Sequence, residues 1–184
     1  MENQDSFIIR PLKISDFDSA AELLSDTTKV TGLNRVDPIL GEEMPGKRTN
    51  SYIFDRFARI YRDVINGNAI AVVAEDKGRI LGFCYAVGNV WPESPHIAEL
   101  RTPIIRTEDM DRGIGGAMIN EIKRQAKGKF EILSLVISSD DEAITKKLES
   151  IYSTQLGFVR WGLAPKFYKK EDKYYPLIFM YSFV

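Results

Sequence analysis

The sequence predicts an α+β fold in a single domain covering residues 6–184. Its 184 residues, 44% of them hydrophobic, suffice for one sizeable core. Strand and helix patterns follow one another in the order β-α-α-β-β-β-α-β-α-β-β. No internal repeat or low-complexity linker divides this series, which favours one domain over two.

The first third of the chain predicts one strand, two helices and a long loop. Phe7–Pro11 has the composition of a short strand ending at proline, which cannot donate a ladder hydrogen bond. Apolar residues recur at helical spacing from Ser15 to Leu24 and from Ile53 to Val64, so each segment has one apolar face. Between them, Asp26–Thr49 is rich in turn-forming residues, and loops of this length are often functional.

Three strands are expected next. Ala69–Glu75 and Arg79–Val87 flank a short polar turn, and Gly78 supplies the positive φ that a tight hairpin needs. A third strand is predicted over His96–Ile105.

The last third predicts two more helices, each followed by strand. An amphipathic helix is expected from Ile114 to Ala126, and the apolar run Phe130–Ile137 is typical of a buried strand. Acidic residues after Ser139 cap a further helix that runs to Leu156. Phe158–Trp161 and Tyr174–Val184 complete the chain as strands.

Charge and cysteine content narrow the class of protein. The 25 basic and 26 acidic residues nearly balance, which removes the electrostatic reason to expect nucleic acid or an anionic membrane as partner. The single cysteine, Cys84, lies in an apolar strand, so no internal disulfide forms and a reducing compartment is favoured. The polar, acidic start lacks the pattern of a secretory signal. We therefore expect a soluble cytoplasmic protein.

The turn Arg112-Gly113-Ile114-Gly115-Gly116 is the strongest functional signal. A glycine-rich turn between a strand and a helix points free backbone N–H groups and the positive end of the helix dipole at one place, which suits a phosphate. A nucleoside-triphosphate loop would need a Gly-Lys-Ser/Thr ending, which is absent. A dinucleotide-binding turn would need a small residue where Met118 stands.

This turn, followed by Ala117 and set within this order of elements, resembles the pyrophosphate loop of the GNAT family of acyl-CoA-dependent N-acyltransferases. The downstream Leu156-Gly157-Phe158 is similar to the family's entry into its next strand. The resemblance covers nearly the whole chain. It implies a mixed, mostly antiparallel central sheet flanked by helices, acetyl-CoA as cosubstrate, and the pantetheine arm held against the preceding strand. The implied cofactor-binding residues are Ile104, Ile105, Asp111, Arg112, Gly113, Ile114, Gly115, Gly116 and Ala117.

The chain departs from the family pattern in three respects. Met110 stands where the family has Gln or Arg, and Glu108, Asp109 and Asp111 place negative charge beside the proposed anion site. Tyr152 precedes Gly157 by four intervening residues, where three are usual.

Two residues are candidates for the chemistry. The position of Glu99 is similar to that of the general base in histone-type members of the family, and a carboxylate there would accept the ammonium proton of the acceptor. Alternatively, Glu99 is a salt-bridge partner of Arg101. Tyr152 corresponds to the tyrosine that protonates the departing CoA thiolate in the family, whereas a core-packing role explains its ring equally well.

The remaining expectations concern partners. His96, the only histidine, has no Cys or second His with which to form a metal site, so no metal is expected.

Lys166, Lys169 and Lys170 are expected on a solvated loop. The aromatic segment Tyr174–Tyr181 would pair across a homodimer if it were an exposed edge, although burial in the core explains it as well.

The resemblance to the GNAT family leads to two hypotheses about function. The acceptor is expected to be a primary amine of a small molecule or peptide, in a pocket walled by the Asp26–Thr49 loop and by Tyr52, Phe57 and Tyr61. The leading hypothesis is direct transfer of acetyl from acetyl-CoA to this amine. The alternative is a non-catalytic CoA-binding or regulatory module on the same fold.

Overall fold

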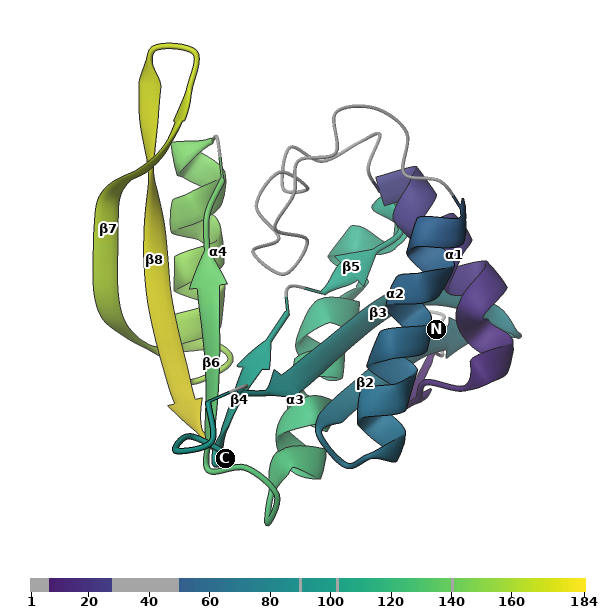
Figure 1. Cartoon of the computed structure of the whole chain (residues 1–184). Coiled ribbons are helices and arrows are strands. Elements are labelled where there is room, and N and C mark those ends of the chain that lie inside the picture. The colour runs from purple at the N-terminus through teal and green to yellow at the C-terminus, as the bar shows by residue number, and fades with distance from the viewer. Residues whose placement is uncertain (1–6, 28–49, 90, 102, 140) are drawn as a thin grey trace, which may run out of the picture.

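A computed structural model describes residues 7–27, 50–89, 91–101, 103–139 and 141–184, and these form one mixed sheet with helices on both faces (Figure 1). The strand order is β1-β2-β3-β4-β6-β8-β7, and β5 pairs with β3 beside this path. The strands are β1 (Ile8–Pro11), β2 (Ala69–Asp76), β3 (Arg79–Gly88), β4 (Ile97–Leu100), β5 (Ile104–Ile105), β6 (Ile132–Ile137), β7 (Val159–Lys170) and β8 (Lys173–Phe183). Every described pairing except β4 with β6 is antiparallel, which confirms the predicted fold class.

The helices divide the core into two layers. The helical elements are η1 (Ile14–Asp16), α1 (Phe17–Thr27), α2 (Asn50–Ile65), η3 (Thr107–Arg112), α3 (Ile114–Ala126) and α4 (Glu142–Thr154). Phe17 and Phe57 of α1 and α2 pack with Phe83 on one face of the sheet. Met118 of α3 and Tyr152 of α4 belong to the cluster on the other face. Adjacent residues of each central strand therefore contribute to different layers.

The hairpin between β2 and β3 forms as predicted. Its turn places Lys77 at φ 48° and Gly78 at φ 82°, so both central residues are left-handed. This is the geometry that matches the right-handed twist of the flanking strands.

The strand predicted over His96–Ile105 is divided into β4 and β5. Opposite β4, Ala86 pairs with Leu100, but opposite β5, Phe83 pairs with Ile104. The pairing register with β3 therefore shifts by one residue between Leu100 and Ile104, as at a β-bulge. Pro103 cannot donate a ladder hydrogen bond, and this accounts for a break that apolar composition alone did not reveal.

The sheet opens at the same level. β4 pairs with β6 only from Ile97–Ile132 to Glu99–Ser134, and β5 has no pairing with β6 among the described residues. In Figure 1, β6 and the β4–β5 segment meet near the C-terminus and diverge from there. The parallel pair thus joins two halves of a sheet that separate beyond Glu99.

The C-terminal hairpin differs from its prediction in length and position. β7 extends to Lys170, so Lys166 lies in a strand and not in the expected loop. β8 pairs with β7 through residues 173–181 and with β6 through residues 178–183, so residues 178–181 lie between two strands, in agreement with the alternative of core burial, whereas residues 174–177 have no β6 partner. The edge belongs to β7, where Trp161 and Leu163 are exposed.

Two further points concern what the described residues contain. Asp26 and Thr27 end α1, whereas the rest of the predicted loop, residues 28–49, lies outside the described residues. In the described part of the chain, every helix is too short or too polar to cross a bilayer.

Candidate functional site

The glycine-rich turn forms the start of α3. Gly113 has φ 75° and serves as the N-cap of α3, and it offers no side chain to cap the helix. The first intrahelical bond runs from the Ala117 N–H to the Gly113 carbonyl at 3.1 Å. The amides of Ile114, Gly115 and Gly116 precede this bond, so they are the donors that a helix leaves without intrahelical partners. Their direction and the helix dipole favour an anion at this end.

The first turn of α3 lies between the two separating halves of the sheet. A Cβ atom on Gly115 would be 3.2 Å from Cδ1 of Ile105, so this glycine packs directly against β5. A Cβ atom on Gly116 would be 3.9 Å from Cδ2 of Leu156, which follows α4. No heavy atom lies within 4 Å of a Cβ built on Gly113. The turn is thus closely packed at its sides and open at its tip.

The charged side chains before the turn are occupied with one another. Arg112 donates to Asp109 at 2.6 Å and to Asp76 at 3.4 Å, and its guanidinium lies 5.8 Å from the centre of the Phe7 ring. Glu108 is ion-paired with Arg79 at the surface. Asp109 is buried, and the ion pair with Arg112 opposes its negative charge. The Arg112 side chain therefore joins η3 to β2.

Arg106 anchors the end of β5 in a similar way. Its Nε donates to the Ile80 carbonyl at 2.8 Å, and its backbone N–H donates to the Leu81 carbonyl at 2.9 Å. Since the N–H of Arg106 points toward β3, strand alternation directs the N–H of Ile105 to the opposite side, where the sheet opens. This places one free strand edge beside the start of α3.

Tyr152 of α4 is buried in the core cluster that also contains residues of α3. Its side chain is buried, and its ring meets Phe158 edge to face at 5.6 Å. Burial raises the pKa of Tyr152, and the charge on a nearby Cys84 thiolate would raise it further. Cys84 is on β3 and its thiol donates to the Arg101 carbonyl at 3.4 Å. The Tyr152 side chain thus reaches from α4 toward the bulge that follows β4.

Lys123 holds the closed end of the sheet together. Its Nζ donates to the Leu156 carbonyl and to the Ser182 Oγ, each at 2.6 Å, and lies 4.7 Å from the centre of the Phe158 ring. Burial lowers the pKa of Lys123. One cation therefore ties α3 to both the end of α4 and β8.

Glu99 lies on the opposite face of β4 from the buried Ala98. Its carboxylate accepts from Arg101 at 2.8 Å, and its Cα is opposite Val87 of β3. The Glu99 side chain is 36% exposed, so it remains accessible in spite of this ion pair. The structure therefore contains the salt bridge that was the alternative interpretation of Glu99.

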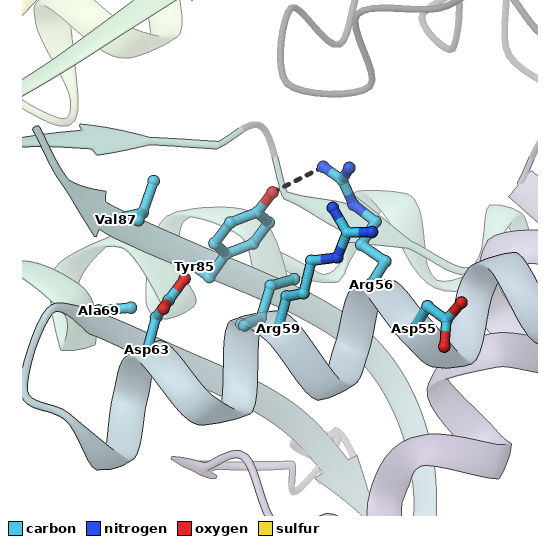
Figure 2. A pocket seen from close by; sticks show the side chains of 8 residues that line it. Asp55, Arg56, Arg59, Asp63, Ala69, Tyr85 and Val87 are labelled. Carbon is cyan, nitrogen blue, oxygen red and sulfur yellow. Dashed lines mark hydrogen bonds between the residues drawn. The ribbon is translucent and has the colours of Figure 1, made fainter. Parts of the chain in front are cut away.

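A hollow of about 190 Å³ lies beside Glu99 on the α2 face of the sheet (Figure 2). Its lining residues are Asp55, Arg56, Arg59, Ile60, Asp63, Ala69, Tyr85 and Val87. Arg56 donates to the Tyr85 hydroxyl at 2.8 Å. Because Val87 is the cross-strand neighbour of Glu99, this pocket and the Glu99 carboxylate are adjacent.

Comparison with solved structures identifies this architecture. A GNAT-family acetyltransferase from Streptococcus pneumoniae matches 97% of this chain and 100% of its own at TM-score 0.75 and 19% identity. An N-acetyltransferase from Staphylococcus aureus Mu50 matches 97% of this chain and 98% of its own at TM-score 0.73 and 18% identity.

This chain has the GNAT fold.

A third structure with the GNAT fold was solved with acetyl-CoA. It is a GNAT superfamily phosphinothricin acetyltransferase from Sinorhizobium meliloti, which matches 97% of this chain and 88% of its own at TM-score 0.74 and 21% identity. No protein-family model matches the sequence, and no curated protein matches it either. The likeness is therefore one of fold.

Within the GNAT fold, the predicted site residues fall into two groups. Ile104, Ile105 and the residues from Asp111 to Ala117 lie together where β5 meets α3. Tyr152 belongs to the core cluster on the same face, whereas Glu99 points to the other face.

The structure places two of the residues predicted to wall an acceptor pocket away from this hollow, although they are on the helix that lines it. Phe57 is 1% exposed in the core, and Tyr61 packs edge to face on Phe17, so neither lines the pocket of this GNAT fold. The side chain of Tyr52 lies outside the described residues. The residues that sequence reasoning missed are on the polar face of α2, above all Arg56 and Arg59. In the sequence, the only sign that Arg56 and Arg59 act together is that they are three positions apart on one helix. Residues of an ordinary solvent-facing helix surface have the same spacing.

The described ranges contain no cluster of three His, Cys, Asp or Glu side chains suited to a metal ion.

Proposed function

We propose that residues 6–184 are an acetyl-CoA-dependent N-acetyltransferase domain that transfers acetyl directly to a primary amine of a small molecule or peptide. The observation that carries the proposal is the position of Gly115 against Ile105. This contact brings the open helix start and the free strand edge together, as binding of one extended cosubstrate requires.

The pyrophosphate of CoA is bound by backbone groups in this proposal. The amides from Asp111 to Ala117 and the dipole of α3 supply the attraction, since the Arg112 guanidinium is engaged with Asp109 and Asp76. The exposed tip at Gly113 leaves room for the anion. Ile104 and Ile105 hold the pantetheine arm, and the outward N–H of Ile105 donates to it.

The chemistry takes place between the two faces of the opened sheet. The acceptor nitrogen attacks the thioester carbonyl carbon, the tetrahedral intermediate collapses, and the C–S bond breaks. An alkyl ammonium must first lose its proton, because its pKa is about three units above neutrality. Glu99 accepts this proton directly or through water. No covalent enzyme intermediate is required.

Tyr152 assists the departing sulfur. Burial raises the pKa of Tyr152, so its hydroxyl stays protonated at neutral pH and donates to the CoA thiolate as the C–S bond breaks.

A non-catalytic CoA-binding module is the second candidate. The ion pair between Glu99 and Arg101 at 2.8 Å favours it, because Arg101 competes with a substrate ammonium for the same carboxylate. The two candidates share the cosubstrate site and differ only in turnover.

Calorimetric titration with CoA and thiol release from acetyl-CoA with a panel of amines and peptides test both candidates. We expect micromolar CoA binding and acceptor-dependent thiol, with Glu99→Gln lowering kcat by about 10² and leaving CoA affinity unchanged. Glu131→Gln, an exposed residue next to β6, is the charge-matched control. CoA binding without any acceptor-dependent thiol would support the binding module, and no CoA binding would contradict both.

A further inference from the structure

We infer that the acceptor amine carries an uncharged apolar group, aromatic or aliphatic, and that this group lies on Val136, Phe179 and Tyr181. The inference rests on the proposed acetyl transfer and specifies its substrate class. It follows from the face of β6 and β8 that lies opposite α4, where apolar side chains continue from Glu99 and belong to neither core cluster.

The two faces of β6 and β8 are packed differently. Leu133, Leu135 and Met180 are buried in the cluster with α3 and α4. In Figure 1, α4 lies against β6, whereas α2 lies over β2 and β3. The alternate residues of β6 and β8 project away from the α4 side, are half-buried or exposed, and belong to neither core cluster. The residues of this outward face are Ile132, Ser134, Val136, Phe179, Tyr181 and Phe183.

The composition of the outward face differs from that of a surface that meets only water. A sheet with one solvated face normally has apolar residues inward and polar residues outward. Here Val136 and the rings of Phe179 and Tyr181 are outward, and Ser134 is the one outward residue of β6 with a polar side chain. Contiguous apolar surface of this kind marks a binding site. The outward face therefore has the composition of a surface that a ligand covers.

The register of three strands places the outward face directly beside Glu99. Glu99 is the parallel partner of Ser134, and Ser134 is the antiparallel partner of Tyr181. Paired residues project to the same face, so these three side chains form one row across β4, β6 and β8. Val136 and its partner Phe179 form the next row. The proposed base and the apolar surface are thus continuous, and this continuity selects the acceptor as the occupant.

Charge and spacing specify the chemistry of the acceptor. Neighbouring strands are about 4.8 Å apart, so about 10 Å separates the backbone at Glu99 from the backbone at Tyr181. Ser134 lies between them, and its small side chain leaves room for a ligand along the row. The residues of the outward face carry no charge, so a second charged group on the acceptor would be desolvated there without a partner. An amine joined by a short chain to an apolar group satisfies both conditions.

The two rings of the outward face are held in place by their neighbours. The Phe179 ring lies 5.3 Å from the Trp161 ring, and its Cδ2 would be 3.3 Å from a Cβ atom on Gly162. The Tyr181 ring meets the Phe183 ring edge to face at 5.5 Å. Both rings nevertheless remain partly accessible. Because they are already positioned, a ligand that packs on them costs little further side-chain entropy.

Acetyl transfer to matched amines tests this substrate class. Phenethylamine and 2-(2-aminoethoxy)ethanol have similar lengths and one ammonium each, but only phenethylamine has an apolar body. Phenethylamine should exceed the polar amine at least about tenfold in kcat/KM. Phe179→Ala should raise the KM of phenethylamine about tenfold, and Val136→Thr, which keeps the side-chain shape, should raise it about threefold. Both variants should leave kcat and the kcat/KM of the polar amine unchanged.

Phe167→Ala is the matched control for loss of a ring. Phe167 is exposed on β7, near the turn of the β7–β8 hairpin and outside the outward face. This variant should leave the KM of both amines unchanged. An equal rise in the KM of phenethylamine in Phe167→Ala, or equal transfer to the two amines by the wild-type protein, would overturn the inference.

Titration with phenethylamine in the presence of CoA provides a readout that does not require turnover. The Val136 methyl resonances, assigned from Val136→Thr, should shift through the ring current of the bound amine, whereas those of Val73 in the α1–α2 core should not. Shifts without any acetyl transfer would support this surface and contradict only the proposed enzyme activity. Absence of the Val136 shifts would overturn the inference. A dimer that Phe179→Ala dissociates with no change in amine preference would also overturn it, because a second copy would then cover the outward face.

Discussion

Gly115 of α3 and Ile105 of β5 are packed so closely that a Cβ atom on Gly115 would lie 3.2 Å from the Ile105 Cδ1. This contact is tighter than ordinary van der Waals contact between carbon atoms. It sets how near the proposed pyrophosphate turn lies to the strand edge that holds pantetheine. The glycine is therefore required by packing at this position as well as by access of an anion.

Gly115→Ala should fold but bind CoA about tenfold more weakly, because the new methyl displaces the Ile105 side chain at the proposed pantetheine site. Ile105→Val removes Cδ1 and with it the clash. In the double variant, CoA affinity should return to within about threefold of that of Ile105→Val alone. Calorimetric titration measures all four proteins, and additive losses would contradict the role of this contact.

Substitution of Gly113 should affect both stability and CoA binding, because its backbone has a positive φ. Gly113 and Gly128 flank α3 with φ 75° and φ 78°, and a Cβ on either would have no heavy atom within 4 Å. Gly113→Ala and Gly128→Ala should each lose about 1–2 kcal/mol of unfolding free energy, the cost of a left-handed L residue. Only Gly113→Ala should also weaken CoA binding. Thermal denaturation and titration separate the two effects, and equal CoA affinities would argue against an anion site at Gly113.

Tyr152→Phe should preserve the fold and slow the reaction. The ring contact with Phe158 remains, so the melting temperature and CoA affinity should hardly change, whereas kcat should fall about 10²-fold. Since burial raises the pKa of Tyr152, wild-type kcat should show no loss from this residue below about pH 10. Tyr174→Phe on β8 is the matched control. An unchanged kcat in Tyr152→Phe would reduce Tyr152 to a packing residue.

Stability should fall in alkaline solution because of the buried thiol. Burial raises the pKa of Cys84 in the folded protein, whereas the pKa of a cysteine thiol in the unfolded chain is about 8.5. Above that pH the unfolded state has fewer bound protons than the folded state, so the unfolding free energy should drop by about 1.4 kcal/mol per pH unit. Urea unfolding from pH 8 to 10.5 measures this slope. In Cys84→Ala the decline should begin only near pH 10, and an identical onset would refute the assignment.

Self-association, if it occurs, should use β7 and not β8. β7 is the edge strand, and its apolar residues Val159, Trp161 and Leu163 are exposed. Size-exclusion chromatography with light scattering should show a dimer that Trp161→Lys converts to monomer. Gln155→Lys, an exposed residue outside β7, controls for the added positive charge. A dimer unaffected by Trp161→Lys would exclude this edge.

The sequence predicted those elements whose local signals agree with their environment. The hairpin at Gly78 formed as expected, because a turn that needs positive φ and two apolar strands specify the same structure. The start of α3 was predicted for the same reason, since Gly113 both ends η3 and begins the helix. Where a local rule competed with apolar composition, as at Pro103, the boundary was misplaced.

Side-chain roles were less predictable, because they depend on partners distant in sequence. Arg112 was expected near an anion, but Asp76, 36 positions away, and Asp109 bind its guanidinium. The charged stripe on α2 has the spacing of a solvent-facing surface, and only its packing over Tyr85 makes it the wall of a pocket.

The sequence alone determined the order of elements and the position of the glycine turn, since both follow from short-range periodicity and from backbone angles that only certain residues adopt. Tertiary structure decided the rest: that β4 pairs with β6 only as far as Glu99, that Tyr152 is buried in the core on the α3 face, and that Arg56 and Arg59 share a pocket with Val87. These relationships depend on which strands pair and which helix face is buried. Such choices are set by long-range packing, on which neighbouring residues carry no information.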